Sequence, residues 1–176
     1  MFELFKQKAQ AVSSEVIEVQ SRQQALEEIK NIILQETDAR LDLAVWAIGK
    51  RFTREEILDS IGQVCFDLNK DNVAPAIVGI TEADFGIAET GTLAIDSTNA
   101  DIRLASSLVS IHIAILCEKE ILAQMKDVLS KLNPNTSAYV AFITGPSRTA
   151  DIERVLTIGV HGPERLIIIV LKGGCE

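Results

Sequence analysis

The chain has 176 residues, of which 47% are hydrophobic and 24% are charged, as is usual for a soluble globular domain. Its 17 lysines and arginines stand against 25 aspartates and glutamates, so the formal net charge is −8. This acidic balance argues against sequence-independent binding of nucleic acid, which needs clustered cations. The 5% share of aromatic residues argues against a base-stacking surface.

The cysteines and the apolar runs bear on the compartment. No stretch reaches the roughly 18 consecutive apolar residues of a membrane helix, and the first residues lack the features of a signal peptide. Cys65, Cys117 and Cys175 are far apart, and such an odd, unpaired set is typical of a reducing cytosol. We interpret Cys65 and Cys117 as small buried hydrophobic residues. We therefore expect a cytoplasmic protein without a metal site or an iron–sulfur motif of its own.

The first part of the chain predicts helices that alternate with short strands. Apolar residues at helical spacing predict a helix over 2–14, and alternation predicts a strand over 15–20. Ser21 begins a capping box of the form S-x-x-Q, so a helix should follow it. Residues 43–46 predict a strand, and Thr53 with two early glutamates opens another helix.

The second part predicts most of the strands. They are expected at 76–80, 93–96, 111–116, 139–143 and 166–171. Residues 118–132 carry apolar side chains at helical spacing and predict one helix. Strands that alternate with helices predict an α/β fold, with a largely parallel sheet flanked by helices and a site beyond the carboxyl ends of the strands. We treat 1–176 as a single domain, with a helix and strand–helix portion over 1–75 and a motif-bearing core over 76–171.

A first candidate segment, residues 79–92, places Glu89 among turn residues and hydroxyls. Glu89 is a candidate general base, nucleophile or ligand-orienting group, and Gly91 allows a ligand to approach the backbone closely. Three threonines add hydroxyls that could bind a carboxylate or a phosphate: Thr81, Thr90 and Thr92. The alternative is a polar turn whose side chains satisfy backbone groups.

A second candidate segment follows the predicted strand at 139–143. A strand, then Gly-Pro-Ser, then a helix start can bind an anion through backbone N–H groups and the helix dipole. Arg148 could pair with a carboxylate or phosphate through two parallel hydrogen bonds. The candidate ligand-binding residues are Gly145, Ser147, Arg148, Thr149 and Asp151. The alternative is a capped helix in which Arg148 is solvated.

Two histidines complete the candidates. His161 stands between two glycines in 159–163, where it could give or take a proton near neutral pH, or be an incidental residue of a turn. His112 lies in an apolar strand, with Arg103 some residues before it. We interpret His112 as a hydrogen-bonded core residue.

Four motifs, in this order, carry a resemblance to a known family. They are Val78-Gly79-Ile80-Thr81, Ala88-Glu89-Thr90-Gly91-Thr92, Gly145-Pro146-Ser147-Arg148-Thr149-Ala150-Asp151-Ile152-Glu153 and Gly159-Val160-His161-Gly162-Pro163. Together they resemble the LUD domain family of lactate utilization proteins, especially its lactate utilization protein C group. The family's motif positions are occupied here by Glu89, Thr90, Gly91, Ser147, Arg148, Asp151 and His161.

The resemblance implies an α/β fold of the sugar-phosphate isomerase and CoA-transferase type. It also implies a part in the oxidation of L-lactate to pyruvate, beside partner subunits that carry iron–sulfur clusters. We therefore expect an accessory subunit that binds a small carboxylate or other anion, has no cofactor of its own, and has Glu89 and His161 as candidate catalytic residues. One alternative is a stand-alone enzyme acting on a sugar phosphate or an acyl-CoA. Another is a non-catalytic module that senses an anionic metabolite.

Overall fold

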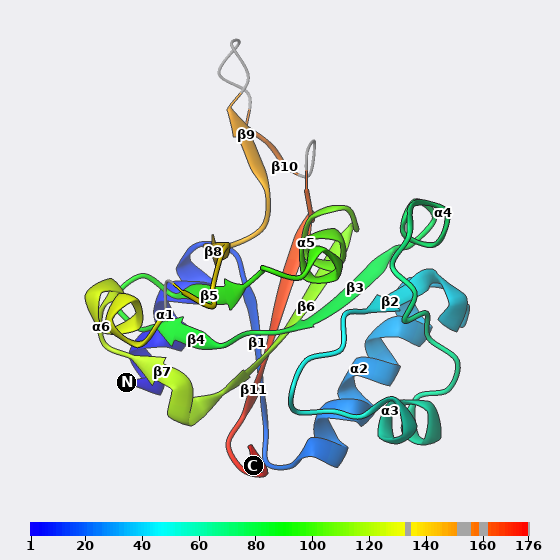
Figure 1. The fold of residues 1–176 in the computed structure, drawn as a ribbon, viewed down its shortest axis with the longest axis horizontal. Coiled ribbons are helices and arrows are strands. Elements are labelled where there is room, and N and C mark those ends of the chain that lie inside the picture. Colours follow the sequence, from blue (N-terminus) through cyan, green and yellow to red (C-terminus); the bar gives the residue numbers. More distant parts are fainter. Residues whose placement is uncertain (133–134, 151–155, 159–161, 176) are drawn as a thin grey trace.

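A five-stranded parallel sheet forms the centre of the molecule, as a computed structural model of the chain shows (Figure 1). The structure describes residues 1–132, 135–150, 156–158 and 162–175. The sheet has the order β1–β11–β6–β3–β2, and its strands are β1 (Glu15–Val19), β2 (Ala44–Trp46), β3 (Val78–Glu82), β6 (Ile111–Cys117) and β11 (Arg165–Leu171). Each neighbouring pair runs parallel, so the predicted α/β fold with a largely parallel sheet is confirmed.

Two helices, one of 15 and one of 7 residues, cover one face of this sheet. They are α2 (Arg22–Glu36) and α3 (Arg54–Ser60). The predicted start signals are in place, because Ser21 Oγ accepts the N–H of Gln24 at 3.2 Å and Thr53 forms a capping box with Glu56. Apolar side chains of both layers meet in one core that includes Ile29, Ile33, Trp46, Ile80, Ile113 and Ile169. Two small elements, η1 (Leu41–Leu43) and α4 (Lys70–Val73), belong to the connections around β2.

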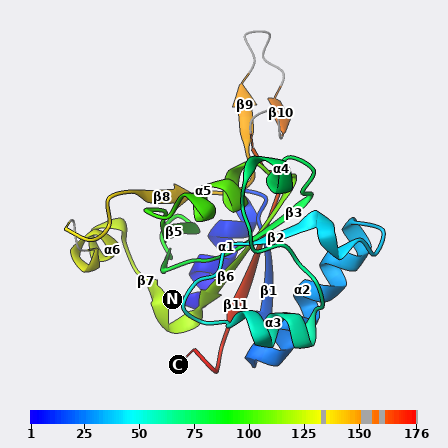
Figure 2. The ribbon, with the colours of Figure 1, turned by 45° about the vertical axis from the view of Figure 1, so that its right-hand side comes forward.

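The opposite face is covered by α1 (Phe2–Ala11), α5 (Ala100–Ser107) and a second sheet (Figures 1 and 2). The second sheet has the order β7–β4–β5–β8, with β4 (Phe85–Ile87), β5 (Thr92–Asp96), β7 (Ile121–Leu122) and β8 (Val140–Ile143). The strands expected at 93–96 and 139–143 therefore exist. They pair antiparallel with each other, outside the parallel sheet.

The helix predicted over 118–132 is wrong in its first half. The chain forms η2 (Glu118–Glu120) and β7, and only then α6 (Met125–Lys131). Ile121 is 1% exposed and pairs with Gly86 of β4, so burial in the second sheet overrides the helical spacing.

The helix expected after residue 145 is also wrong. Residues Arg148–Ala150 form β9, which pairs antiparallel with β10 (Leu156–Ile158). Both views show this pair extending away from the two sheets (Figures 1 and 2). The pairing of Thr149 with Thr157 shows the physical reason: the backbone finds its hydrogen bonds in a second strand, and β-branched residues suit that conformation.

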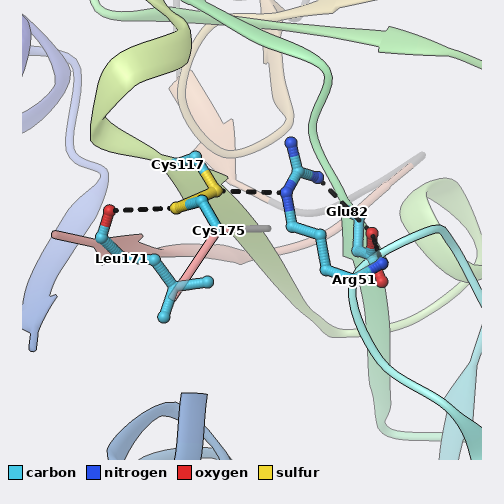
Figure 3. The surroundings of a disulfide bond; sticks show 5 residues. All are labelled: Arg51, Glu82, Cys117, Leu171 and Cys175. Atoms are coloured by element: carbon cyan, nitrogen blue, oxygen red, sulfur yellow. Dashed lines mark hydrogen bonds and ion pairs between the residues drawn. A yellow bond between two sulfur atoms is a disulfide. The ribbon is translucent and has the colours of Figure 1, made fainter. Parts of the chain in front are cut away.

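A disulfide joins Cys117, at the end of β6, to Cys175, which follows β11 (Figure 3). Our interpretation of Cys117 as a simple buried hydrophobic residue is therefore wrong. The two residues are 58 positions apart, and such a connection cannot be deduced from spacing. Cys65 carries a free thiol. Among the described residues, no helix is long and apolar enough to cross a membrane.

Candidate functional site

A cavity of about 380 Å³ lies among α5, β8 and the amino ends of β6 and β11, and we call it the His112 cavity. It is lined by Ser97, Arg103, Ser106, Ser107, His112, Tyr139, Ala141, Phe142, Ile143, Thr144, Gly145, Pro146, Ser147, Gly162, Pro163 and Leu166. Two of the four sequence motifs thus contribute to one wall. The site was expected beyond the carboxyl ends of the strands, and these motif segments lie instead at the amino ends of β6 and β11.

His112 is a buried residue of this cavity with a titratable side chain. It is 1% exposed, and Thr81 Oγ1 lies 2.8 Å from its Nε2. Burial lowers the pKa of His112 to about 4, so the imidazole is neutral at physiological pH. Its Nδ1 has no hydrogen-bond partner among the described residues. The histidine therefore has unused hydrogen-bonding capacity beside a cavity, beyond the core role we predicted.

Arg103 carries the only formal charge among the described residues that line the His112 cavity. Its Nη1 donates to the carbonyl oxygens of Ser97 and Thr98, and its guanidinium lies 5.4 Å from the centre of the Tyr139 ring. These contacts hold the cation in place on α5. A fixed cation surrounded by hydroxyls suits a carboxylate or another small anion.

The motif around Ser147 and the motif that ends at Pro163 pack against each other. The N–H of Ser147 donates to the carbonyl oxygen of Pro163 at 2.8 Å. A methyl group added to Gly162 would lie 3.0 Å from Ser147 Cβ. The structure therefore brings together two segments that the sequence placed about 15 residues apart.

The three threonines of the first candidate segment, residues 79–92, connect to the cavity lining through other side chains. Thr81 holds His112, as described above. Thr90 Oγ1 donates to Thr92 Oγ1 at 2.7 Å, and Thr92 Oγ1 lies 2.7 Å from the hydroxyl of Thr144, which lines the cavity. The predicted hydroxyls thus reach the cavity through other side chains.

Three other predicted residues instead anchor α1. Gly91 has φ +67°, and a methyl group there would lie 2.2 Å from the backbone N of Ala9. Gly145 has φ +77°, and a methyl group there would lie 2.4 Å from the carbonyl oxygen of Val12. Arg148 Nη2 donates to that same oxygen and to Ser13 Oγ, both at 2.8 Å. Arg148 thus gives a partner to a carbonyl group at the carboxyl end of α1, where such groups need partners, and the two glycines let the chain approach that end closely.

Glu89 lies outside the lining of the His112 cavity. It is exposed, and its Oε1 accepts the N–H of Met125, the first residue of α6, at 2.9 Å. This contact matches the alternative in which the carboxylate satisfies an orphan backbone group. Asp151 and His161 lie outside the described residues, and Thr149 is placed only as a backbone position of β9.

Sequence reasoning named Arg103 beside His112 but gave it no role, and it missed Ser106 and Ser107, because it did not predict α5. Arg103, Ser106 and Ser107 stand at positions i, i+3 and i+4, which share one face of a helix. That spacing was a usable signal. Among the described residues, no group of histidine, cysteine and acidic side chains is arranged to hold a metal ion.

The chain is thus an α/β protein with a largely parallel sheet, in which two of the four sequence motifs line one cavity. The LUD domain model matches residues 2–171, and the chain belongs to that family. The resemblance drawn from the four motifs is thereby confirmed. A solved structure of a DUF162 family protein from Deinococcus radiodurans has a TM-score of 0.69 and 20% identity to the chain, covering 97% of this chain and 96% of that one. It shows the same fold.

Similar proteins include two that are named lactate utilization protein C. The one from Halalkalibacterium halodurans is 38% identical over 103 residues, which are 55% of this chain and 45% of that protein. The one from Geobacillus sp. (strain WCH70) is 37% identical over 109 residues, which are 58% of this chain and 45% of that protein. The match thus spans less than half the length of these relatives.

Proposed function

We propose that the chain binds a small carboxylate in the His112 cavity and acts as an accessory subunit in the oxidation of L-lactate to pyruvate. In this proposal, partner subunits carry the iron–sulfur clusters, and this chain holds no cofactor of its own. The observation that carries it is the convergence of two family motifs on a cavity whose described lining has Arg103 as its only charge. The names of the similar proteins supply the link to lactate.

The residues of the cavity have separate parts in this proposal. Arg103 pairs with the carboxylate of the ligand, and the hydroxyl of Ser147 adds a hydrogen bond. Neutral His112 offers Nδ1 to the hydroxyl or keto oxygen of a 2-hydroxy or 2-oxo acid. Glu89 and Arg148 support α6 and α1, so they act on the cavity only through the fold.

A binding experiment with a matched pair of arginine variants tests the site. Titration of the full chain with L-lactate and with pyruvate should show binding that Arg103→Gln weakens at least tenfold, as the loss of a charge-assisted pair predicts. Arg148→Gln removes the same charge from a motif residue outside the lining, so it should leave the affinity unchanged in folded protein. Equal affinity of wild type and Arg103→Gln would refute the assignment.

A genetic experiment tests the role in metabolism. Deletion of the gene should abolish L-lactate-dependent electron transfer in host extracts, and added wild-type protein should restore it. Arg103→Gln should restore it less well than Arg148→Gln. Purification from native extract should also bring down a protein that contains iron–sulfur clusters. Unchanged electron transfer after deletion would contradict the role in lactate oxidation. The carboxylate-binding part of the proposal would then rest on the titration alone.

A further inference from the structure

A second cavity, of about 510 Å³, lies beyond the carboxyl ends of β2 and β3. We call it the Glu82 cavity, and it is lined by Gly49, Lys50, Arg51, Glu82, Asp84, Phe85, Asp96, Thr98, Asn99, Ile102, Glu120 and Cys175. Its volume is within the range of small-molecule sites, and ligands of parallel α/β sheets bind at this end of the strands. No residue of the His112 cavity lining belongs to it, so it needs its own explanation.

Glu82, the last residue of β3, is held firmly at the base of this cavity. Its side chain is 4% exposed. Its Oε2 accepts the backbone N–H of Lys50 at 2.8 Å. The same oxygen accepts the backbone N–H of Arg51 at 2.9 Å and lies 3.4 Å from Arg51 Nη1 (Figure 3). The chain at Gly49 makes room for the carboxylate, because a methyl group there would lie 2.4 to 2.8 Å from its atoms.

Arg51 is fixed from its other side as well. Its Nε donates to Cys117 Sγ at 3.2 Å, and Cys117 is bonded to Cys175, which lines the cavity (Figure 3). The guanidinium is therefore committed to Glu82 Oε2 and to sulfur. The guanidinium makes no hydrogen bond to Oε1, the second oxygen of the Glu82 carboxylate.

That second oxygen, Oε1, is buried and has no hydrogen-bond partner among the described residues. A buried acceptor without a donor is costly, so a bound donor would be favoured there. Two neighbouring acids, Asp84 and Asp96, differ in this respect. Asp84 Oδ2 accepts the backbone N–H of Asp96. In Asp96, Oδ1 accepts the hydroxyl of Thr98 and Oδ2 accepts the hydroxyl of Ser137.

The charges around the cavity favour a cationic donor. Four acidic side chains and two basic ones are among the lining residues. Of the two basic ones, Arg51 is committed to Glu82 Oε2, and Lys50, whose side chain is 90% exposed, lies 3.8 Å from Asp84 Oδ1, so neither reaches Glu82 Oε1. An ammonium group would therefore meet an unused carboxylate oxygen and an excess of negative charge. A neutral hydroxyl would gain only the hydrogen bond.

We propose that the Glu82 cavity binds a small primary amine whose ammonium group donates to Glu82 Oε1. Because Oε1 is shielded from water in the structure, the amine reaches it through a rearrangement of side chains, which is common on binding. This site is separate from the His112 cavity. It adds a cationic ligand to a protein whose other cavity suits an anion.

Calorimetric titration of the full chain with 1,4-diaminobutane tests the proposal, with 1,4-butanediol as an uncharged probe of the same length. The diamine should bind at least tenfold more tightly than the diol. Glu82→Gln should weaken diamine binding at least tenfold, as the loss of a charge-assisted hydrogen bond predicts. Glu55→Gln, which removes an exposed carboxylate outside this lining, should leave it unchanged.

A second variant covers the case in which Glu82→Gln does not fold. Gly49→Ala keeps every charge but places a methyl group against the carboxylate, so it should also weaken diamine binding at least tenfold. Circular dichroism identifies the folded variants. The proposal is overturned by any of three results: no diamine binding by wild type, equal binding of the diol, or unchanged diamine binding by a folded Glu82 or Gly49 variant.

Discussion

Arg148 and Arg103 have different surroundings, and their side-chain contacts explain why sequence alone did not separate their roles. Arg148 was predicted to bind an anion, yet it donates to Val12 and Ser13 at the end of α1. Arg103 faces the cavity from a helix that the sequence analysis did not predict. A motif shows which residue types occur together. It does not show which of them reaches the ligand and which one supports a neighbouring helix.

Glu89 gives a test of this distinction. Its carboxylate accepts the first N–H of α6, so Glu89→Gln should lower the free energy of unfolding by about 0.5–1 kcal/mol, as loss of a helix-terminal contact does. Carboxylate binding in the His112 cavity should not change. Urea denaturation and calorimetric titration of the same samples measure both quantities. A loss of binding at unchanged stability would instead support the catalytic role predicted from the sequence.

His112 gives a prediction about pH. Its pKa is about 4 in the folded chain, against 6.5 for the free side chain, so the unfolded chain binds more protons between these values. The contribution of His112 to stability is therefore complete above pH 6.5 and is lost as the pH falls toward 4. At about 1.4 kcal/mol per pKa unit, the loss amounts to about 3 kcal/mol.

The measurement compares wild type with His112→Gln. The free energy of unfolding of wild type should fall more steeply from pH 7 to pH 4 than that of the variant, and the difference isolates this histidine from all other titrating groups. Parallel curves would show that the imidazole is not held neutral by burial.

At the scale of elements, the parallel strands were predicted well because their signal is local. Strands β6 and β11 are continuous apolar runs, as expected for strands buried on both faces. The failures occur where distant pairing decides. Residues 121–122 have helical spacing but pair with β4, and residues 148–150 follow a helix-start pattern but pair with β10. No local pattern reports a partner strand elsewhere in the chain.

The anchoring of α1 by two glycines can be tested at this scale. Gly91→Ala or Gly145→Ala should each lower stability by about 2–5 kcal/mol, because the new methyl group meets backbone atoms within 2.4 Å and φ is positive. Gly174→Ala is the matched control. Its φ is +70°, but its nearest contact is an ordinary 3.4 Å, so it should cost only about 1–2 kcal/mol. If thermal melts show the same loss of stability for all three variants, close packing of the two glycines against α1 is not what makes them important.

At the scale of the whole molecule, the disulfide links the end of the central strand β6 to the segment that follows its neighbour β11. Cross-linking residues 58 positions apart restricts the unfolded chain, so reduction should lower the free energy of unfolding by up to about 4 kcal/mol. Guanidinium denaturation with and without a thiol reductant measures the change. A Cys117→Ser, Cys175→Ser double variant should not respond to the reductant. An equal response in that variant would assign the effect to something other than this bond.

The position of β11 has a consequence for the synthesis of the protein. β11 is the last strand of the parallel sheet in the sequence, yet it lies between β1, the first strand, and β6 (Figure 1). While the ribosome is still adding residues 165–171, β1 has no neighbour and one edge of β6 stays open. Such open edges favour wrong pairing and aggregation. The parallel sheet can therefore close only after the ribosome has synthesised β11. We expect chaperones to bind a nascent chain that stalls before β11 is made.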